Sequence, residues 1–168
     1  MESKNFGIRK EVLKYDEAMN KQRNLIYRDR NKVLFEEDID AVIGDMVDVL
    51  VDNIYTSNSE DEFIEEVRDV FGVEVEKVSG VSLLDSAKEM IREIDLDEIS
   101  FKKSLVLSVV DKYWVEHLDL CDQVKKVVPL QAIGQKDPLK EYTIEVFAMF
   151  DEMSEKINRD VVCHIYRR

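Results

Sequence analysis

The 168 residues contain few of the residue types that build turns, disulfide frameworks or metal centres. Glycine occurs five times and proline twice, too rarely for a many-stranded sandwich or barrel. Cys121 and Cys163 are the only cysteines and form no CxxC pair, so both are expected to be reduced, buried or half-buried thiols. With His117 and His164 as the only histidines, a metal site is hard to assemble, and none is predicted.

Long apolar runs, leader sequences and catalytic motifs are scarce as well. No apolar stretch approaches the ~18–20 residues that cross a bilayer, and no apolar segment follows Met1 as it would in a secretory leader. The patterns GxxxxGK[ST], GxGxxG, HExxH and GxSxG do not occur, nor do the Glu-x-x-His pairs of a di-iron bundle. We therefore expect a reduced, cytosolic chain with no transmembrane segment and no catalytic residues.

Charge is distributed unevenly along the chain, which carries −13 overall. Residues 1–35 have a net charge of +4, residues 36–99 of −17, and residues 100–168 of zero. An acidic chain repels phosphate backbones, so a general nucleic-acid binder is disfavoured. The breaks predict three segments with different surroundings, and the simplest interpretation of the middle one is a solvated acidic face.

The first segment predicts one long helix over residues 3–34, about 45–50 Å in length at ~1.5 Å per residue. A heptad seam with alternating spacings of four and three is formed by Ile8, Val12, Tyr15, Met19, Gln22, Ile26 and Val33. The stripe is widened by Phe6, Leu13, Tyr27 and Leu34. A wide stripe indicates several neighbouring helices, and any part of it that stays exposed favours self-association.

The middle segment predicts short helices joined by turns. A helix over residues 38–55 is followed by a turn, and a short helix then ends at Gly72, a residue suited to the position after a helix. Residues 73–80 alternate weakly and favour a short extended piece. A further helix is predicted over residues 83–94, and residues 95–97 are expected to begin the next.

The last segment predicts a helical hairpin. One helix keeps its apolar spacing up to Pro129, and a second runs from Pro138 to about Tyr166, with Asp137 suited to the N-cap. Because the connection is short, the two helices must be antiparallel neighbours with an exposed tip at about 132–137. The predicted fold class is all-α: a long scaffold helix packed with an antiparallel two-helix hairpin, plus a small inserted helical subdomain.

Trp114 and His117 lie one helical turn apart on the first hairpin helix. A histidine on an apolar-leaning face is most often a satisfied structural residue, because catalytic use would need a partner that the sequence does not show. Trp114 favours a packing anchor over part of a ligand site.

Two separate blocks of sequence, residues 3–34 and 101–150, resemble in the same order the C-terminal region of the SecA family. Members of this family are the ATP-driven motors of bacterial protein export. The residues that carry the resemblance as structural family positions are Asn5, Arg9, Tyr15, Asp16, Arg23, Trp114, His117, Leu118, Asp122, Pro138, Tyr142, Phe147 and Phe150. The middle of the chain resembles the family only in helical character and position.

The resemblance implies two domains. Residues 1–36 and 98–168 would form the helical scaffold domain, with a two-helix finger over 101–168, and residues 37–97 would form the inserted helical wing domain. The nucleotide-binding domains, the peptide-crosslinking domain and the zinc-binding tail of the family have no counterpart in these residues. We therefore expect a piece of a longer protein that hydrolyses no ATP alone, with ATP and Mg²⁺ belonging to the parent.

The resemblance also implies partners, namely the SecYEG channel, an unfolded preprotein and the motor domains of the parent, at the inner face of the bacterial plasma membrane. The finger tip that would contact channel and preprotein consists of Gln131, Ala132, Ile133, Gly134, Gln135, Lys136 and Asp137. The family commonly has tyrosine where this chain has Ile133 and arginine where it has Gln131. These departures would suit an accessory motor or a divergent lineage.

Two other classes of function are open at the level of sequence. A stand-alone helical adaptor or coiled-coil interaction protein would also use a long helix for assembly. A longer reading frame with Walker motifs ahead of Glu2 would separate the motor from the adaptor. An α-helical enzyme is disfavoured because no acid–base or metal set is visible.

Overall fold

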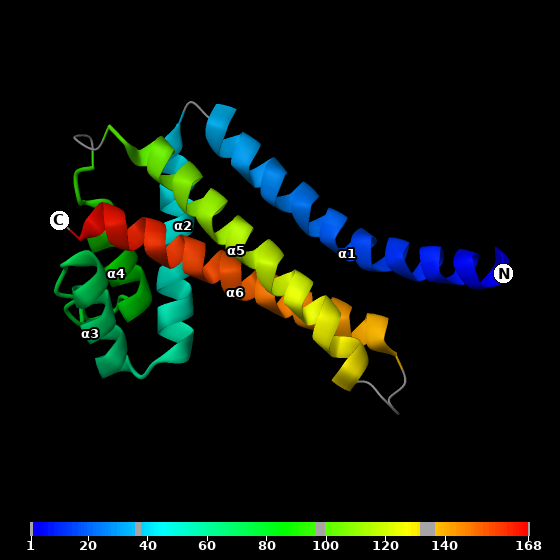
Figure 1. Ribbon diagram of the computed structural model, residues 1–168. Coiled ribbons are helices and arrows are strands. Elements are labelled where there is room, and N and C mark those ends of the chain that lie inside the picture. Colours follow the sequence, from blue (N-terminus) through cyan, green and yellow to red (C-terminus); the bar gives the residue numbers. More distant parts are fainter. Residues whose placement is uncertain (1, 36–37, 97–99, 132–136, 168) are drawn as a thin grey trace. The chain divides into compact units, whose positions relative to one another are not determined.

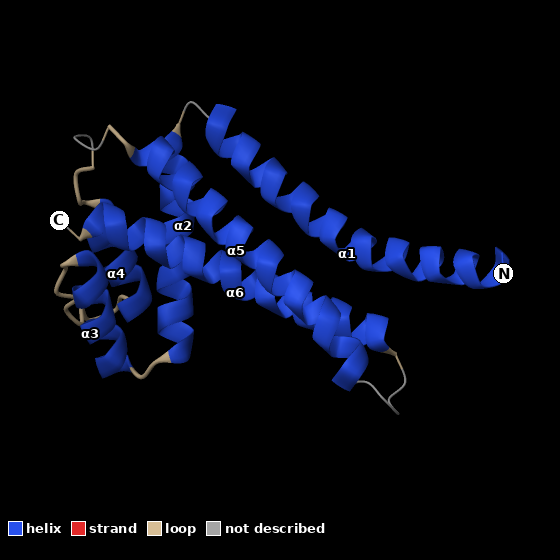
Figure 2. Ribbon diagram, in the orientation of Figure 1, coloured by secondary structure: helices blue, strands red, loops and turns tan. Residues whose placement is uncertain are grey.

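Figure 1 shows the computed structural model, which describes residues 2–35, 38–96, 100–131 and 137–167. These residues form helices and no strand, as Figure 2 shows, so the all-α prediction is confirmed. The helices are α1 (Glu2–Phe35), α2 (Ile39–Ser57), α3 (Glu60–Phe71), α4 (Leu83–Arg92), α5 (Lys102–Gln131) and α6 (Pro138–Tyr166). The chain divides into two compact units, and α5 and α6 contribute residues to both.

The first unit consists of Met1–Lys32 and Val110–Ser154. Within it, α5 and α6 run antiparallel (Figure 1). His117 of α5 contacts Phe150 of α6, whereas Val128, farther along α5, shares a buried cluster with Tyr142, near the start of α6. Residues later in α5 thus meet residues earlier in α6, which is the order that an antiparallel pair requires.

The predicted seam of α1 is confirmed where its side chains are described. Gln22 and Ile26 are buried, and Tyr15 is half-buried against the other two helices of this unit. Leu13 and Tyr27 are 66% and 48% exposed, so part of the widened stripe faces solvent. The predicted seam and stripe residues whose side chains lie outside the described part are Phe6, Ile8 and Val12.

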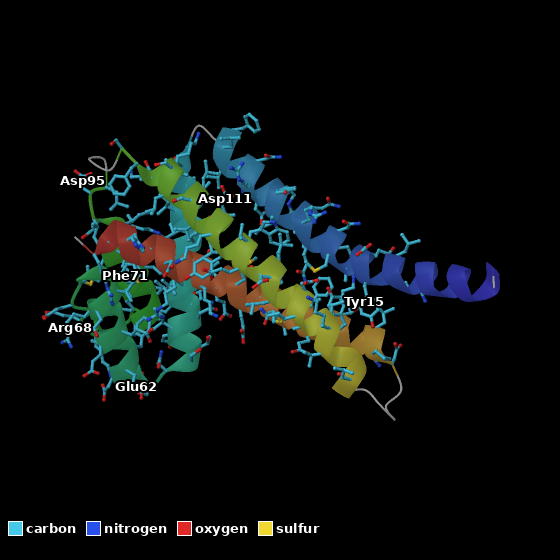
Figure 3. The ribbon with its side chains drawn as sticks, viewed as in Figure 1. Tyr15, Glu62, Arg68, Phe71, Asp95 and Asp111 are labelled. Carbon is cyan, nitrogen blue, oxygen red and sulfur yellow. The ribbon has the colours of Figure 1, made fainter. Side chains whose placement is uncertain are left out.

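The second unit consists of Val33–Val109 and Glu155–Arg168, and in it α2, α3 and α4 pack on one another. The core consists of side chains that are at most 3% exposed: Ile43, Val51, Ile54, Phe63, Val67, Val70, Ala87, Ile91, Val106, Val161, Val162 and Ile165. Phe71, labelled near the end of α3 in Figure 3, packs edge to face on Tyr166 with ring centroids 5.1 Å apart. This unit therefore has an apolar core of its own.

Capping chemistry sets the ends of the short helices in the second unit. The Asp38 side chain caps α2, and Ser82 caps α4. At the start of α3, Ser59 and Glu62 form a reciprocal capping box. Gly72 follows α3 with φ of 72°, a left-handed conformation that favours glycine and ends the helix as predicted.

Two segments between α3 and α5 carry predictions from the sequence. Residues 73–80 form neither helix nor strand (Figure 2), so the short extended piece expected there stays a prediction. Asp95 and Leu96 are not helical, and Asp97 lies outside the described residues. The following helix begins only at Lys102, after the carbonyl of Phe101 accepts the first intrahelical bond from Leu105 at 2.9 Å.

The end of α5 also differs from the prediction. Apolar spacing placed the end of this helix at Pro129, but the helix continues to Gln131. A proline removes one N–H donor and disfavours the helical turn before it, but it does not prevent the two residues after it from being helical. The predicted boundaries of the scaffold and wing, at 36–37 and 97–98, do not coincide with the two compact units and stay a prediction.

Candidate functional site

The predicted finger tip lies mostly outside the described residues. Outside them are Ala132, Ile133, Gly134, Gln135 and Lys136. Gln131 is the last residue of α5, and its side chain is not described either. Asp137 is exposed directly before Pro138, the first residue of α6, and its carboxylate accepts a hydrogen bond from the N–H of Lys140 at 3.4 Å. The tip therefore stays a prediction.

Tyr142 brings several of the family positions together near the start of α6. Its ring lies edge to face against Tyr15 of α1, labelled in Figure 3, with centroids 4.9 Å apart, and Phe147 packs against the same cluster. Beside them, the carboxylate of Asp16 lies 3.8 Å from the ammonium of Lys125. Burial, with smaller effects from nearby acidic groups, raises the pKa of Tyr142 to about 12, so its hydroxyl stays protonated.

Other predicted positions do not join this cluster. Arg23 is exposed and donates to Asn20 on the same helix, at 3.5 Å. Asp122 is exposed and pairs with Lys126 one turn along α5, at 3.2 Å. Leu118 is half-buried. The side chains of Asn5 and Arg9 lie outside the described part.

A buried set of polar groups joins α1, α5 and α6 in the first unit. The amide nitrogen of Gln22, a residue with 0% exposure on α1, donates to the carbonyl of Val146 on α6 at 2.9 Å. The amide oxygen of Gln22 lies 2.6 Å from Nε2 of His117 on α5. Because a carbonyl only accepts, the amide nitrogen must face Val146, so the amide oxygen accepts from His117 and the histidine carries its proton on Nε2. We call these three groups the polar junction.

Aromatic and apolar groups enclose His117, which is 3% exposed. Its ring stacks on Trp114, with centroids 5.6 Å apart, and meets the edge of Phe150 at 5.8 Å. The sulfur of Cys121 lies 3.3 Å from its Nε2. Burial lowers the pKa of His117 and raises the pKa of Cys121 to about 11, so both groups are neutral near pH 7. This is the environment of a structural histidine.

An open apolar groove of about 330 Å³ lies between the later part of α5 and the early part of α6. It is lined by Leu120, Gln123, Val124, Val127, Val128, Glu145 and Met149. Leu120, Val127 and Leu130 are 49%, 45% and 70% exposed along α5. The hairpin thus presents apolar surface to solvent close to its predicted tip.

The described residues hold no group of three or more His, Cys, Asp or Glu side chains that could bind a metal ion. Among the helices as far as they are described, none is long and apolar enough to cross a membrane. Cys121 is buried and Cys163 is half-buried, and both are free thiols, as predicted.

The roles of two buried polar residues are not predicted from the sequence. Gln22 belongs to the predicted seam, and a single polar residue on an otherwise apolar seam is a signal for a specific partner. Lys102 is 5% exposed, and its ammonium lies 2.5 Å from the carboxylate of Asp40. A lysine at the start of a helix normally indicates a solvated position, so no pattern in the sequence pointed to this pair.

Comparison with known proteins gives consistent matches over the whole chain. The family model described as "SecA Wing and Scaffold domain" matches residues 1–168. The protein translocase subunit SecA 2 of Clostridioides difficile is 34% identical over 99% of this chain and 24% of its own length. SecA 1 of the same organism is 33% identical, covering 99% of this chain and 21% of that protein. SecA of Halothermothrix orenii is 33% identical, and the match covers 99% of this chain and 23% of that protein. The chain thus spans about a quarter or less of the length of these relatives.

Proposed function

Because the chain belongs to the SecA wing and scaffold family, we propose that it is the mechanical coupling part of an ATP-driven preprotein translocase. The observation that carries this proposal is the family match over residues 1–168, together with relatives that are named protein translocase subunits. In this proposal residues 1–36 and 98–168 are the scaffold, and residues 37–97 are the wing. ATP and Mg²⁺ bind to other parts of a longer protein.

The helices of the first unit support a coupling role. α5 has 30 residues, which at ~1.5 Å per residue gives a rod of about 45 Å. Its later part packs antiparallel against α6, and α1 contacts both helices through the polar junction and the Tyr142 cluster. A rod braced by two neighbours can pass a displacement of α1 to the hairpin tip, because packed helices move as units.

The proposed partners are those that membership of the SecA family implies. The hairpin tip, residues 131–137, enters a SecYEG channel and contacts an unfolded preprotein. The apolar groove between α5 and α6 and the exposed side chains near it suit contact with an unfolded chain, which exposes its own apolar residues. The working location is the cytoplasmic face of the bacterial plasma membrane, where the protein is bound peripherally.

The test replaces the matching segment of C. difficile SecA 2 with residues 1–168. ATP hydrolysis and transport of a preprotein into SecYEG vesicles are then measured for this chimera. Ile133→Asp places a charge at the tip, and Ile144→Asp is the matched control, because Ile144 is an isoleucine of α6 that is 56% exposed. The chimera should bind SecYEG, hydrolyse ATP and transport the preprotein. Ile133→Asp should reduce transport at least tenfold with little change in hydrolysis, and Ile144→Asp should reduce neither.

Two outcomes would count against the proposal. A folded chimera that neither binds SecYEG nor responds to preprotein would favour a stand-alone helical adaptor instead of a motor part. Equal losses of transport in Ile133→Asp and Ile144→Asp would remove the specific role of the tip.

A further inference from the structure

The amide of Gln22 is out of place among its neighbours on α1. Ala18 and Ile26, one turn away on either side, are apolar and 6% exposed, whereas Gln22 is polar and 0% exposed. Burying an amide is unfavourable unless its hydrogen bonds are restored inside the protein. Packing alone would be served as well by leucine, so the amide must contribute something that an apolar side chain does not.

Gln22 has one partner on each of the other two helices. It donates to the Val146 carbonyl of α6 and accepts from His117 of α5, at 2.9 Å and 2.6 Å. These bonds span 124 and 95 residues of sequence, so neither can form within a single helix. The Trp114 and Phe150 rings enclose His117, so water cannot readily replace the amide.

The two bonds respond differently from apolar contacts when a helix slides. An apolar seam repeats every three or four residues, so α1 could move by one turn of about 5.4 Å and bring Ala18 or Ile26 to the position of Gln22. Such a move would separate the Gln22 amide from both of its partners and leave the His117 ring with only the Cys121 thiol, a weak hydrogen-bonding group. Only one axial position of α1 therefore satisfies both groups.

We propose that Gln22 and His117 act as a register lock that fixes the axial position of α1 on the α5–α6 hairpin. They are positioning residues, and their part in transport rests on the proposed function. When α1 moves along its axis, the α5–α6 hairpin then moves with it, because the register between them does not change. Without the lock, α1 still packs on the hairpin but occupies more than one register, and part of each movement is lost as sliding.

Spin-label distances in the 168-residue chain test the lock directly. Ketone-bearing amino acids replace the exposed Asn24 of α1 and Glu116 of α5 and carry nitroxides that do not react with thiols. The parent chain should give one narrow distance distribution. Gln22→Leu should broaden it or add a second population displaced by about one helical turn, ~5 Å along the helix axis. His117→Leu should act in the same way.

Two control variants separate the lock from packing. Ile26→Leu changes the seam next to Gln22 but keeps the polar junction, so its distribution should stay narrow. His117→Gln retains an N–H donor for the Gln22 oxygen and should also stay close to the parent. A narrow, unshifted distribution in Gln22→Leu overturns the lock. Loss of folding in that variant, seen in the fluorescence of Trp114, overturns it too, because the proposal requires the apolar seam to keep α1 packed.

The SecA 2 chimera tests the role of the lock in transport. With Gln22→Leu, preprotein-stimulated ATP hydrolysis should persist while the length of chain transported per ATP falls severalfold, whereas Ile26→Leu should change neither. Unchanged transport per ATP despite a broadened distance distribution would refute the positioning role. The spin-label distances are measured in the 168-residue chain alone. They therefore test whether Gln22 and His117 fix the axial position of α1 even if the chimera shows that the proposed function is wrong.

Discussion

Lowering the pH should destabilise the first unit through His117. Its pKa is lowered by burial in the folded protein, whereas an unfolded histidine titrates near ~6.5. Between these two values the unfolded chain binds more protons than the folded one, so the free energy of unfolding falls as the pH falls. Above the pKa of histidine in the unfolded chain, His117 adds no pH dependence to the free energy of unfolding. The contribution of neutral His117 to the stability of the folded chain is thus fully present above pH ~6.5 and is lost progressively below it.

The size of the effect follows from the linkage relation. While His117 stays neutral in the folded state, each pH unit below ~6.5 lowers the free energy of unfolding by up to about 1.4 kcal/mol. At pH 5.5 the loss relative to pH 7.5 is therefore at most about 1.4 kcal/mol. The closed environment of His117, 3% exposed between Trp114 and Phe150, is the reason to expect a loss in this direction.

Urea unfolding at pH 7.5, 6.5 and 5.5, followed by tryptophan fluorescence, measures this effect. Trp114 is the only tryptophan and stacks on His117, so the signal reports on the first unit. His117→Gln should remove the extra loss, because its amide does not titrate and can still donate to Gln22. His164→Gln is the control, since His164 is the other histidine and is exposed. The reasoning is refuted if His117→Gln keeps the full pH dependence of the parent chain.

Three further predictions concern individual residues. Gly72→Ala should lower the free energy of unfolding by about 1–2 kcal/mol, because the residue has φ of 72°. Gly44→Ala inside α2 should instead raise the free energy of unfolding by up to about 1 kcal/mol. Urea unfolding followed by circular dichroism compares the two variants. In the same assay, Asp40→Ala should destabilise the chain more than Lys102→Met, because only the first variant leaves the buried ammonium without its partner. With a thiol-reactive dye at pH 8, Cys163 should react rapidly. Cys121 is 1% exposed and has a pKa of about 11, so it should react only when the chain unfolds. Equal reaction rates of the two thiols would contradict the structure.

The sequence predicted the fold wherever apolar periodicity or capping chemistry was strong. The seam of α1, the Gly72 end of α3 and the Pro138 start of α6 all depend on local interactions that a single helix already shows. The helix start expected at 95–97 was wrong, since Asp95 and Leu96 are not helical and the next helix begins at Lys102. The helix end expected at Pro129 was two residues too early, because a proline disfavours a helix without always ending it.

The candidate site was predictable in part. Tyr15, Tyr142 and Phe147 share a cluster, and Trp114 stacks on His117, so several positions selected by family resemblance do lie together. The partner of His117 was not predicted. Gln22 is 95 residues away in sequence, and pairing at such a distance depends on how the helices pack, which one-dimensional periodicity does not determine.

The long separation in sequence between Gln22 and its two partners has a consequence for synthesis on the ribosome. α2, α3 and α4 pack on one another within residues 39–92, so much of the second unit can assemble as soon as this stretch has emerged. The Val146 carbonyl appears 124 residues after Gln22, and until then α1 has no hairpin to cover its apolar face. During that interval the nascent chain exposes Ile26 and its neighbours, and a chaperone that holds nascent chains would protect this apolar face from aggregation.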